Sequence, residues 1–243
     1  MTNGRGKVAL VTGANKGIGK AIVRGLAHAG FTVYLGARDK ELGKAAVSEL
    51  SGDGDVRFIP LDVTDETSVR AAADKIAQDF SRLDVLVNNA GVSGVGEDGL
   101  IRKPSELTAN DLRVVYETNV FAVVTVTNVF LPLLRRAVAG RIVNVTSKRG
   151  SIGDEGAWVG RPYMPYSSSK TALNALTAHY ARELANTPIK VNGAAPGHVA
   201  TDFNNFRGTR TPDEGAAVAV RLAQQGADAP SGVVFENDQQ LSW

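Results

Sequence analysis

The sequence has no cysteine among its 243 residues, so disulfide bonds, thiolate metal sites and cysteine nucleophiles are excluded. Its 27 basic and 25 acidic residues leave a net charge of +2, too small to indicate a nucleic-acid partner. No apolar run approaches ~18 residues and no apolar signal segment begins the chain, so we expect no membrane partner and a cytoplasmic location. His28, His179 and His198 lack the spacing of metal ligands, and we expect no metal site.

Short apolar, β-rich runs alternate with helix-like segments along the whole chain. We expect strands at 7–12, 32–37, 56–61, 83–87, 140–146, 189–195 and 233–236. We expect helices at 20–29, 40–50, 64–80, 165–185, 201–206 and 211–225, and a long helix capped by Thr108 or Asn110 and ending near Arg136. This alternation predicts one α/β domain over residues 1–243, a Rossmann-type doubly wound parallel sheet with helices on both faces.

A glycine-rich turn follows the first expected strand. Gly13, Gly17 and Gly19 stand between that strand and the first expected helix. This layout places backbone N–H groups where a phosphate binds at a helix N-terminus. The spacing G-x-x-x-G-x-G differs from the G-x-G-x-x-G dinucleotide fingerprint, and a tight turn without a ligand is the alternative interpretation.

Two cations stand near the expected ribose end of such a site. Arg38 follows the second strand, where proteins that prefer NAD usually carry an acidic residue, and Lys16 lies in the glycine turn. Both suit an additional 2′-phosphate through charge-assisted hydrogen bonds. Asp39 acts against this preference unless it caps the helix at 40–50. We therefore predict NADPH as the cofactor, with NADH less favoured.

Tyr166 and Lys170 are four residues apart on an expected helix, so they share one face. A free phenol has a pKa of about 10, and a nearby ammonium lowers it. A phenol tuned in this way can give a proton to a carbonyl oxygen or take one from an alcohol. Tyrosine and lysine also share helix faces by chance, so the pair needs support from the rest of the chain.

Several motifs in order supply that support. They are Thr12-Gly13-x-x-x-Gly17-Ile18-Gly19, Asn88-Asn89-Ala90-Gly91, Asn119, Ser147, Tyr166-x-x-x-Lys170 and Pro196-Gly197. Together they resemble the short-chain dehydrogenase/reductase family over almost the whole chain. The motifs at strand ends converge on the carboxyl edge of the expected sheet, where open parallel sheets bind ligands.

The resemblance implies a role for each of four residues. Tyr166 would be the general acid in carbonyl reduction and the base in the reverse reaction. Lys170 would lower its pKa and hold the hydroxyl groups of the nicotinamide ribose. Ser147 would hydrogen-bond the substrate oxygen, and Asn119 would hold a water that continues a proton relay from Lys170.

The resemblance also implies a set of cofactor contacts. The set comprises Gly13, Asn15, Lys16, Gly17, Ile18, Gly19, Arg38, Asp62, Val63, Asn89, Ala90, Gly91, Pro196, Gly197, Val199 and Thr201. Asp62 and Val63 would contact the adenine, and the segment from Pro196 to Thr201 would flank the nicotinamide amide.

Within the family, the chain is similar to carbonyl reductases of the human and plant type. The spacing from Ser147 to Tyr166 is longer than usual, and the resemblance implies that these extra residues cover the face used for tetramers. We therefore expect a monomer, with a dimer or tetramer as the alternatives. Substrate loops are expected at about 92–105, 150–165 and 197–210. Ser93, Trp158 and Tyr163 would frame the pocket, although Trp158 could equally plug the space beneath its loop.

Three functions compete. The first is NADPH-dependent reduction of hydrophobic aldehydes or ketones, small-molecule substrates, to alcohols. The second is an NAD(P)-dependent secondary-alcohol dehydrogenase that works oxidatively with the same residues. The third is a sensor that binds NADP without turnover, against which the presence of both Tyr166 and Lys170 argues.

Overall fold

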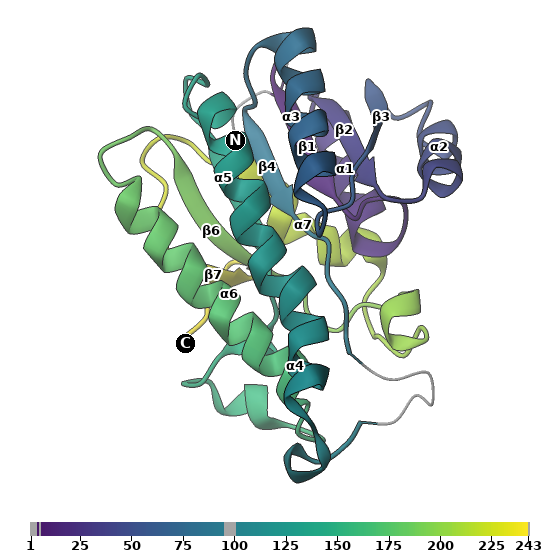
Figure 1. The fold of residues 1–243 in the computed structure, drawn as a ribbon. Coiled ribbons are helices and arrows are strands. Elements are labelled where there is room, and N and C mark those ends of the chain that lie inside the picture. Colours follow the sequence, from purple (N-terminus) through teal and green to yellow (C-terminus); the bar gives the residue numbers. More distant parts are fainter. Residues whose placement is uncertain (1–3, 5, 95–100, 243) are drawn as a thin grey trace.

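The computed structural model describes residues 4, 6–94 and 101–242, and within them the chain builds one eight-stranded sheet (Figure 1). The strands are β1 (Val8–Thr12), β2 (Thr32–Ala37), β3 (Val56–Pro60), β4 (Val85–Asn88), β5 (Arg141–Val145), β6 (Lys190–Ala195), β7 (Val234–Glu236) and β8 (Gln239–Gln240). Their order is β3-β2-β1-β4-β5-β6-β7-β8. All neighbours pair in parallel except β7 and β8. The predicted Rossmann-type α/β fold is confirmed.

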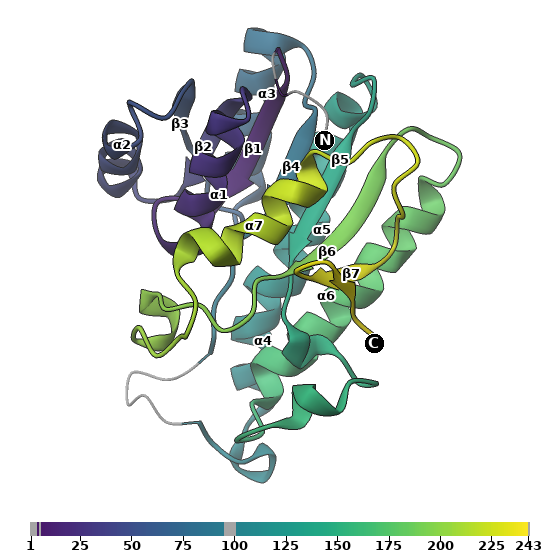
Figure 2. The ribbon, with the colours of Figure 1, turned by 180° about the vertical axis from the view of Figure 1, so that it is seen from behind.

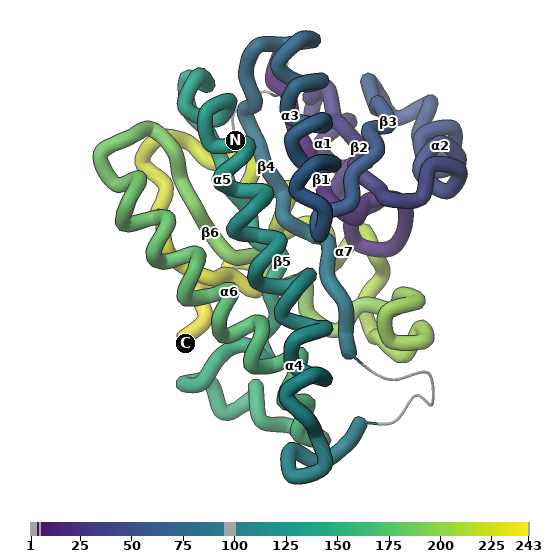
Figure 3. The backbone as a smooth tube through the Cα atoms, viewed as in Figure 1, coloured from purple at the N-terminus to yellow at the C-terminus, as the bar shows by residue number. Residues whose placement is uncertain are grey.

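Helices cover both faces of the sheet. They are α1 (Gly17–His28), α2 (Lys40–Glu49), α3 (Glu66–Phe80), α4 (Ala109–Tyr116), α5 (Ala122–Leu134), α6 (Met164–Glu183) and α7 (Pro212–Ala223). Helices α3, α5 and α6 lie on the face seen in Figure 1, and α1 and α7 lie on the opposite face in Figure 2. Figure 3 shows α4 leading into α5 along the same line, beside α6.

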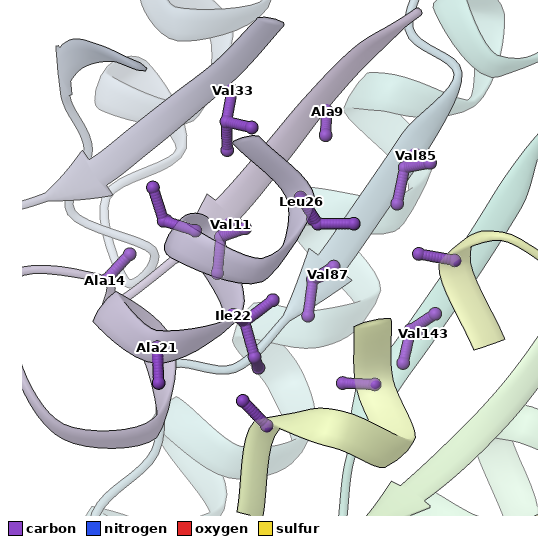
Figure 4. Close-up of a cluster of buried hydrophobic side chains, with 14 of the residues drawn as sticks. Ala9, Val11, Ala14, Ala21, Ile22, Leu26, Val33, Val85, Val87 and Val143 are labelled. Atoms are coloured by element: carbon purple, nitrogen blue, oxygen red, sulfur yellow. The ribbon is translucent and has the colours of Figure 1, made fainter. Parts of the chain in front are cut away.

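The core forms as two apolar layers because side chains alternate across each strand. Ala9 and Val11 of β1 point toward α1, where Ile22 and Leu26 pack on them (Figure 4). Leu10 belongs to the layer under α3 and α5. All five residues of β1 are buried, as is typical of a parallel strand covered on both faces. Full burial of a side chain such as Leu26 stabilises the fold by about 1.5–3 kcal/mol.

The long helix predicted from residue 108 to Arg136 is interrupted. Thr108 does cap α4, because its hydroxyl accepts the Asp111 N–H and the Asp111 carboxylate accepts the Thr108 N–H in return. A π-helical turn, Glu117–Phe121, then separates α4 from α5. The run Ala109–Leu134 is long and apolar enough to cross a membrane, but Phe130 is completely buried in the layer beside α3. About half of its apolar window (44%) is buried inside the protein.

Two other boundaries differ from the prediction. The helix expected at 201–206 is only a short 3₁₀ turn, Asp202–Asn204, because Asn205 and Phe206 take left-handed backbone angles of 53° and 57° in φ. After the last expected strand the chain turns back at residues 237–238 to form β8, which the sequence did not predict. Asn237, at φ 52°, supplies the left-handed residue that a two-residue hairpin turn requires.

Candidate active site

A cleft of about 510 Å³ opens at the carboxyl edge of the sheet. It is lined by the segments that follow β1, β2, β3, β4, β5 and β6, and by the first turns of α6. All sixteen expected cofactor residues line it, together with Ser147, Tyr163, Tyr166 and Lys170. Within residues 6–94 and 101–242, no group of three or more His, Asp or Glu side chains is placed to hold a metal ion.

The glycine turn approaches its neighbours too closely for side chains. A Cβ atom on Gly19 would lie 2.5 Å from the Asn89 Nδ2 and 2.6 Å from the Gly13 carbonyl oxygen. Asn89 in turn clamps the turn, because its amide donates to the carbonyls of Thr12 at 2.9 Å and Gly13 at 3.0 Å. The bare backbone at the start of α1 fits a phosphate-bearing dinucleotide.

Arg38 lines the cleft directly after β2 and is exposed. Asp39 is the N-cap of α2, and its carboxylate accepts the Leu42 N–H at 2.9 Å. The capping interpretation of Asp39 is therefore confirmed. Lys16 also lines the cleft, but its ammonium pairs with Asp202 at 2.7 Å, a contact that the sequence did not reveal. That bond lowers the pKa of the Asp202 carboxyl.

Tyr166 lies on the first turns of α6, partly buried in the cleft. Its ring centre is 5.6 Å from that of Tyr163 and 5.6 Å from that of Phe203. The Lys170 ammonium is 5.7 Å from the Tyr166 ring centre. Ser147 hydrogen-bonds the Tyr166 hydroxyl from the end of β5. The phenol is thus held between aromatic rings, a hydroxyl and an ammonium.

Burial raises the pKa of Tyr166 to about 12. The hydrogen bond from Ser147 and the positive charge of Arg149 lower the Tyr166 pKa, and Tyr163 raises it, but burial outweighs the rest. The sequence predicts that Lys170 brings the phenol toward neutral pH. That expectation is wrong for the groups of this chain, because the loss of hydration of a phenolate exceeds the gain from nearby charges.

Lys170 is 5% exposed, and its ammonium donates to the Val145 carbonyl at 2.8 Å. Burial lowers the pKa of Lys170 to about 8. A lysine with a lowered pKa can hold or release a proton near neutral pH, which suits a proton relay.

Asn119 lies in the π-helical turn, behind the residues that line the cleft. Its side-chain oxygen accepts the Val92 N–H at 2.8 Å, and its amide donates to the Val92 carbonyl and the Ser169 hydroxyl, both at 3.0 Å. A Cβ on Gly91 would lie 3.2 Å from the Asn119 oxygen and 3.7 Å from the Lys170 ammonium. Asn119 therefore fixes the segment after β4 close to Lys170.

Ser147 lies two residues after β5 and caps a short 3₁₀ turn, Lys148–Gly150. Its hydroxyl oxygen accepts the Arg149 N–H at 3.2 Å, which leaves its O–H free to donate. Gly150 lets this turn approach α6, because a Cβ there would lie 2.7 Å from the Lys170 backbone. That close approach sets Ser147 beside Tyr166.

The expected substrate pocket needs two corrections. Trp158 is 68% exposed and does not line the cleft, so it is neither a pocket wall nor a buried plug. Ser93 does not line the cleft either, and the rest of that expected loop, residues 95–100, lies outside the described residues. Phe203, from the expected segment 197–210, takes the wall position, and Arg149 joins it. Arg149 was missed because the motif that revealed this segment ends at Ser147.

The sequence model of the family described as short chain dehydrogenase matches residues 7–211. Salutaridine reductase of Papaver bracteatum is 34% identical, over 95% of this chain and 94% of that protein. The NADPH-bound carbonyl reductase from chicken fatty liver superposes with a TM-score of 0.87 at 28% identity, over 98% of this chain and 100% of that one. The RhlG–NADP complex of Pseudomonas aeruginosa gives 0.85 at 31% identity, over 98% of both chains.

The chain therefore belongs to the short-chain dehydrogenase family. It is an oxidoreductase that acts on carbonyl or alcohol substrates, in a family that uses NAD(P).

Proposed function

We propose that this protein reduces aldehydes or ketones to alcohols with NADPH, as a carbonyl-reductase-like member of its family. The same residues catalyse both directions, so the cofactor end of the cleft carries the choice, because exposed Arg38 favours NADPH while Asp39 caps a helix. Tyr166, beside Ser147 and Lys170, is placed to donate its proton to a carbonyl oxygen.

In this proposal NADPH supplies the hydride to the carbonyl carbon. Ser147 would orient the carbonyl oxygen with its O–H, and Tyr166 would deliver the proton to it. Lys170 would hold the nicotinamide ribose and pass on the proton that replaces the one given up by Tyr166. Asn119 keeps the Gly91 segment in place for a water in that relay.

NADPH is favoured over NADH by the charges at the far end of the cleft. Arg38 is exposed in the cleft lining, while Asp39, the nearby carboxylate that would repel a 2′-phosphate, is used as a helix cap. Lys16 can exchange Asp202 for a phosphate, because an exposed ion pair is worth only about 1 kcal/mol or less. The chicken carbonyl reductase and RhlG were solved with NADPH and NADP, which agrees with this choice.

The test is the consumption of NADPH and NADH, side by side, with a panel of aromatic aldehydes, β-ketoesters, quinones and isatin. We expect turnover with NADPH that falls by roughly 10²–10⁴-fold in Tyr166→Phe. Tyr180→Phe is the matched control, since it removes a hydroxyl that bonds Asn128 outside the cleft lining and should keep most of the activity. Tight NADPH binding without turnover of any panel member would instead support the NADP-binding sensor.

We further propose a cytoplasmic monomer. The resemblance to carbonyl reductases implies that extra residues between Ser147 and Tyr166 cover the face that other members use to form tetramers, and this supports the monomer. Light scattering on the purified protein should give the mass of one chain, and a mass of two or four chains would refute this part of the proposal.

A further inference from the structure

A second cation, Arg149, lines the cleft two residues after Ser147. It is partly buried, and it shares the substrate side of the cleft with Tyr166, Tyr163 and Phe203. Neither the hydride transfer nor the proton relay requires it. An arginine at this place therefore calls for another explanation.

The guanidinium of Arg149 is held by neutral partners. Its Nη1 donates to the Arg161 carbonyl at 3.3 Å and its Nη2 to the Val159 carbonyl at 3.2 Å. Across the part of the chain that the structure describes, no carboxylate forms an ion pair with Arg149. By contrast, the neighbouring Lys148 pairs with Asp154 at 3.3 Å. Two of the five donors of Arg149 are used in this way, which orients the fork and leaves its charge uncompensated.

This charge is separate from the cofactor end of the cleft. Arg38 follows β2 and Arg149 follows β5, and the strand order places β1 and β4 between them. Three strand spacings correspond to about 14 Å along the sheet edge. The positive charge of Arg149 instead reaches the Tyr166 phenol, where it lowers the pKa against the effect of burial. Arg149 thus stands beside the proton donor rather than beside the ribose end.

We propose that Arg149 binds a carboxylate of the substrate, so that the preferred substrates are keto acids with an aromatic or apolar body. The carbonyl would lie at Tyr166 and Ser147, the carboxylate at the guanidinium fork, and the body against the rings of Phe203 and Tyr163. An arginine fork matches a carboxylate in shape and charge, and a partly buried site strengthens the interaction. This proposal rests on the proposed reductase function and names its substrate class.

The experiment compares benzoylformate with its methyl ester, with NADPH as the reductant. The two probes share the ring and the ketone and differ in one negative charge. In Arg149→Gln we expect kcat/KM for the acid to fall by about 10- to 100-fold, mostly through KM, and kcat/KM for the ester to change by less than about 3-fold. Arg149→Lys should recover part of the loss, since it restores the charge without the fork.

Arg161→Gln is the matched control. It removes the same charge from the same loop, but the Arg161 side chain is exposed and does not line the cleft. We expect both probes to be reduced as by the wild type. For each protein we divide kcat/KM for the acid by kcat/KM for the ester. Comparing this ratio between variant and wild type cancels the different intrinsic reactivity of the two ketones.

Three outcomes would overturn the assignment. If Arg149→Gln lowers kcat/KM equally for the acid and the ester and also lowers Tm, Arg149 stabilises its loop and does not bind the carboxylate. Reduction of the ester but not of the acid by the wild type would refute the keto-acid class while leaving the reductase function intact. Reduction of neither probe, with aromatic aldehydes still reduced, would do the same.

Discussion

The two ends of the cleft are built in different ways. At the cofactor end, Gly13, Gly19 and Asn89 meet after β1 and β4, and the backbone of the glycine turn lies against the Asn89 side chain. At the substrate end, Arg149 lies in the 3₁₀ turn Lys148–Gly150 and Phe203 lies in the 3₁₀ turn Asp202–Asn204. The glycine turn at the first end leaves no room for an added side chain at Gly13 or Gly19, whereas the second end is defined by which side chains are present.

The two ends are also joined. The ion pair between Lys16 and Asp202 links the glycine turn to the turn that carries Phe203. Because both partners are largely exposed, this link is weak and can yield to a bound phosphate. The following predictions break or sharpen the comparison between the two ends.

The largest effect is expected from Gly19→Ala at the cofactor end. The new Cβ would meet the Asn89 amide and the Gly13 carbonyl at about 2.5 Å, so the turn must shift. A displacement of about 1 Å near a reacting centre can cost roughly 100-fold in activity, and we expect a loss of that size in NADPH affinity and kcat/KM. Titration of NADPH fluorescence measures it. Gly52→Ala is the control, since its Cβ would meet nothing within 4 Å, and equal behaviour of both variants would contradict the prediction.

Lys170 lies where the two ends meet, and its pKa makes stability depend on pH. Burial lowers that pKa from 10.5 to about 8, so between these values the unfolded chain binds more protons than the folded chain. Folding stability contributed by this group therefore rises with pH across that window. Between about pH 8 and about pH 10, we expect the free energy of unfolding to rise by about 2 kcal/mol less in Lys170→Met than in the wild type. This difference is a factor of about 30 in the folding equilibrium.

Urea unfolding at about pH 8 and about pH 10 measures this difference. Lys44→Met is the control, because the Lys44 side chain is 56% exposed and should leave the wild-type pH dependence unchanged. A wild-type slope retained in Lys170→Met would show that the ammonium is hydrated in the folded protein.

Arg38→Ala tests the selectivity of the cofactor end. Removal of the guanidinium should lower the ratio of kcat/KM for NADPH to that for NADH by roughly 10-fold. Only NADPH has the 2′-phosphate, so only NADPH loses a charge-assisted hydrogen bond in the variant. Arg149→Gln, at the substrate end, should leave this ratio unchanged. If Arg149→Gln changes the cofactor ratio and Arg38→Ala does not, the assignment of the two ends is reversed.

The smallest effect distinguishes two aromatic residues near the substrate end. Phe203 packs beside Tyr166, so Phe203→Ala should raise KM for aromatic substrates by about 5-fold through lost apolar contact. Trp158 is exposed and outside the cleft lining, so Trp158→Ala should leave KM and Tm nearly unchanged. A substrate series measured with both variants decides the matter, and a larger effect from Trp158 would mean that its loop closes over bound substrate.

Most of the fold could be predicted because the alternation of apolar strands and helices is a local property. The same holds for Gly19, Ser147 and Tyr166, whose places after strands or at the start of α6 follow from their order in the chain. The interrupted helix at Asn119 could not be predicted, because the Asn119 side chain in the π-helical turn bonds Val92 and Ser169. Segments distant in sequence make those bonds, and no periodicity reveals them.

By itself, the sequence determined the sheet, the edge where ligands bind and the residue types gathered there, because strand order and motif spacing are written along the chain. Only the tertiary structure decided how those residues behave. Burial raised the pKa of Tyr166 where the neighbouring lysine alone predicted the reverse. The tertiary structure also leaves the Trp158 side chain exposed to solvent and places Arg149 in the cleft lining. Hydration and charge depend on every segment that packs around a group, and that environment exists only in the folded chain.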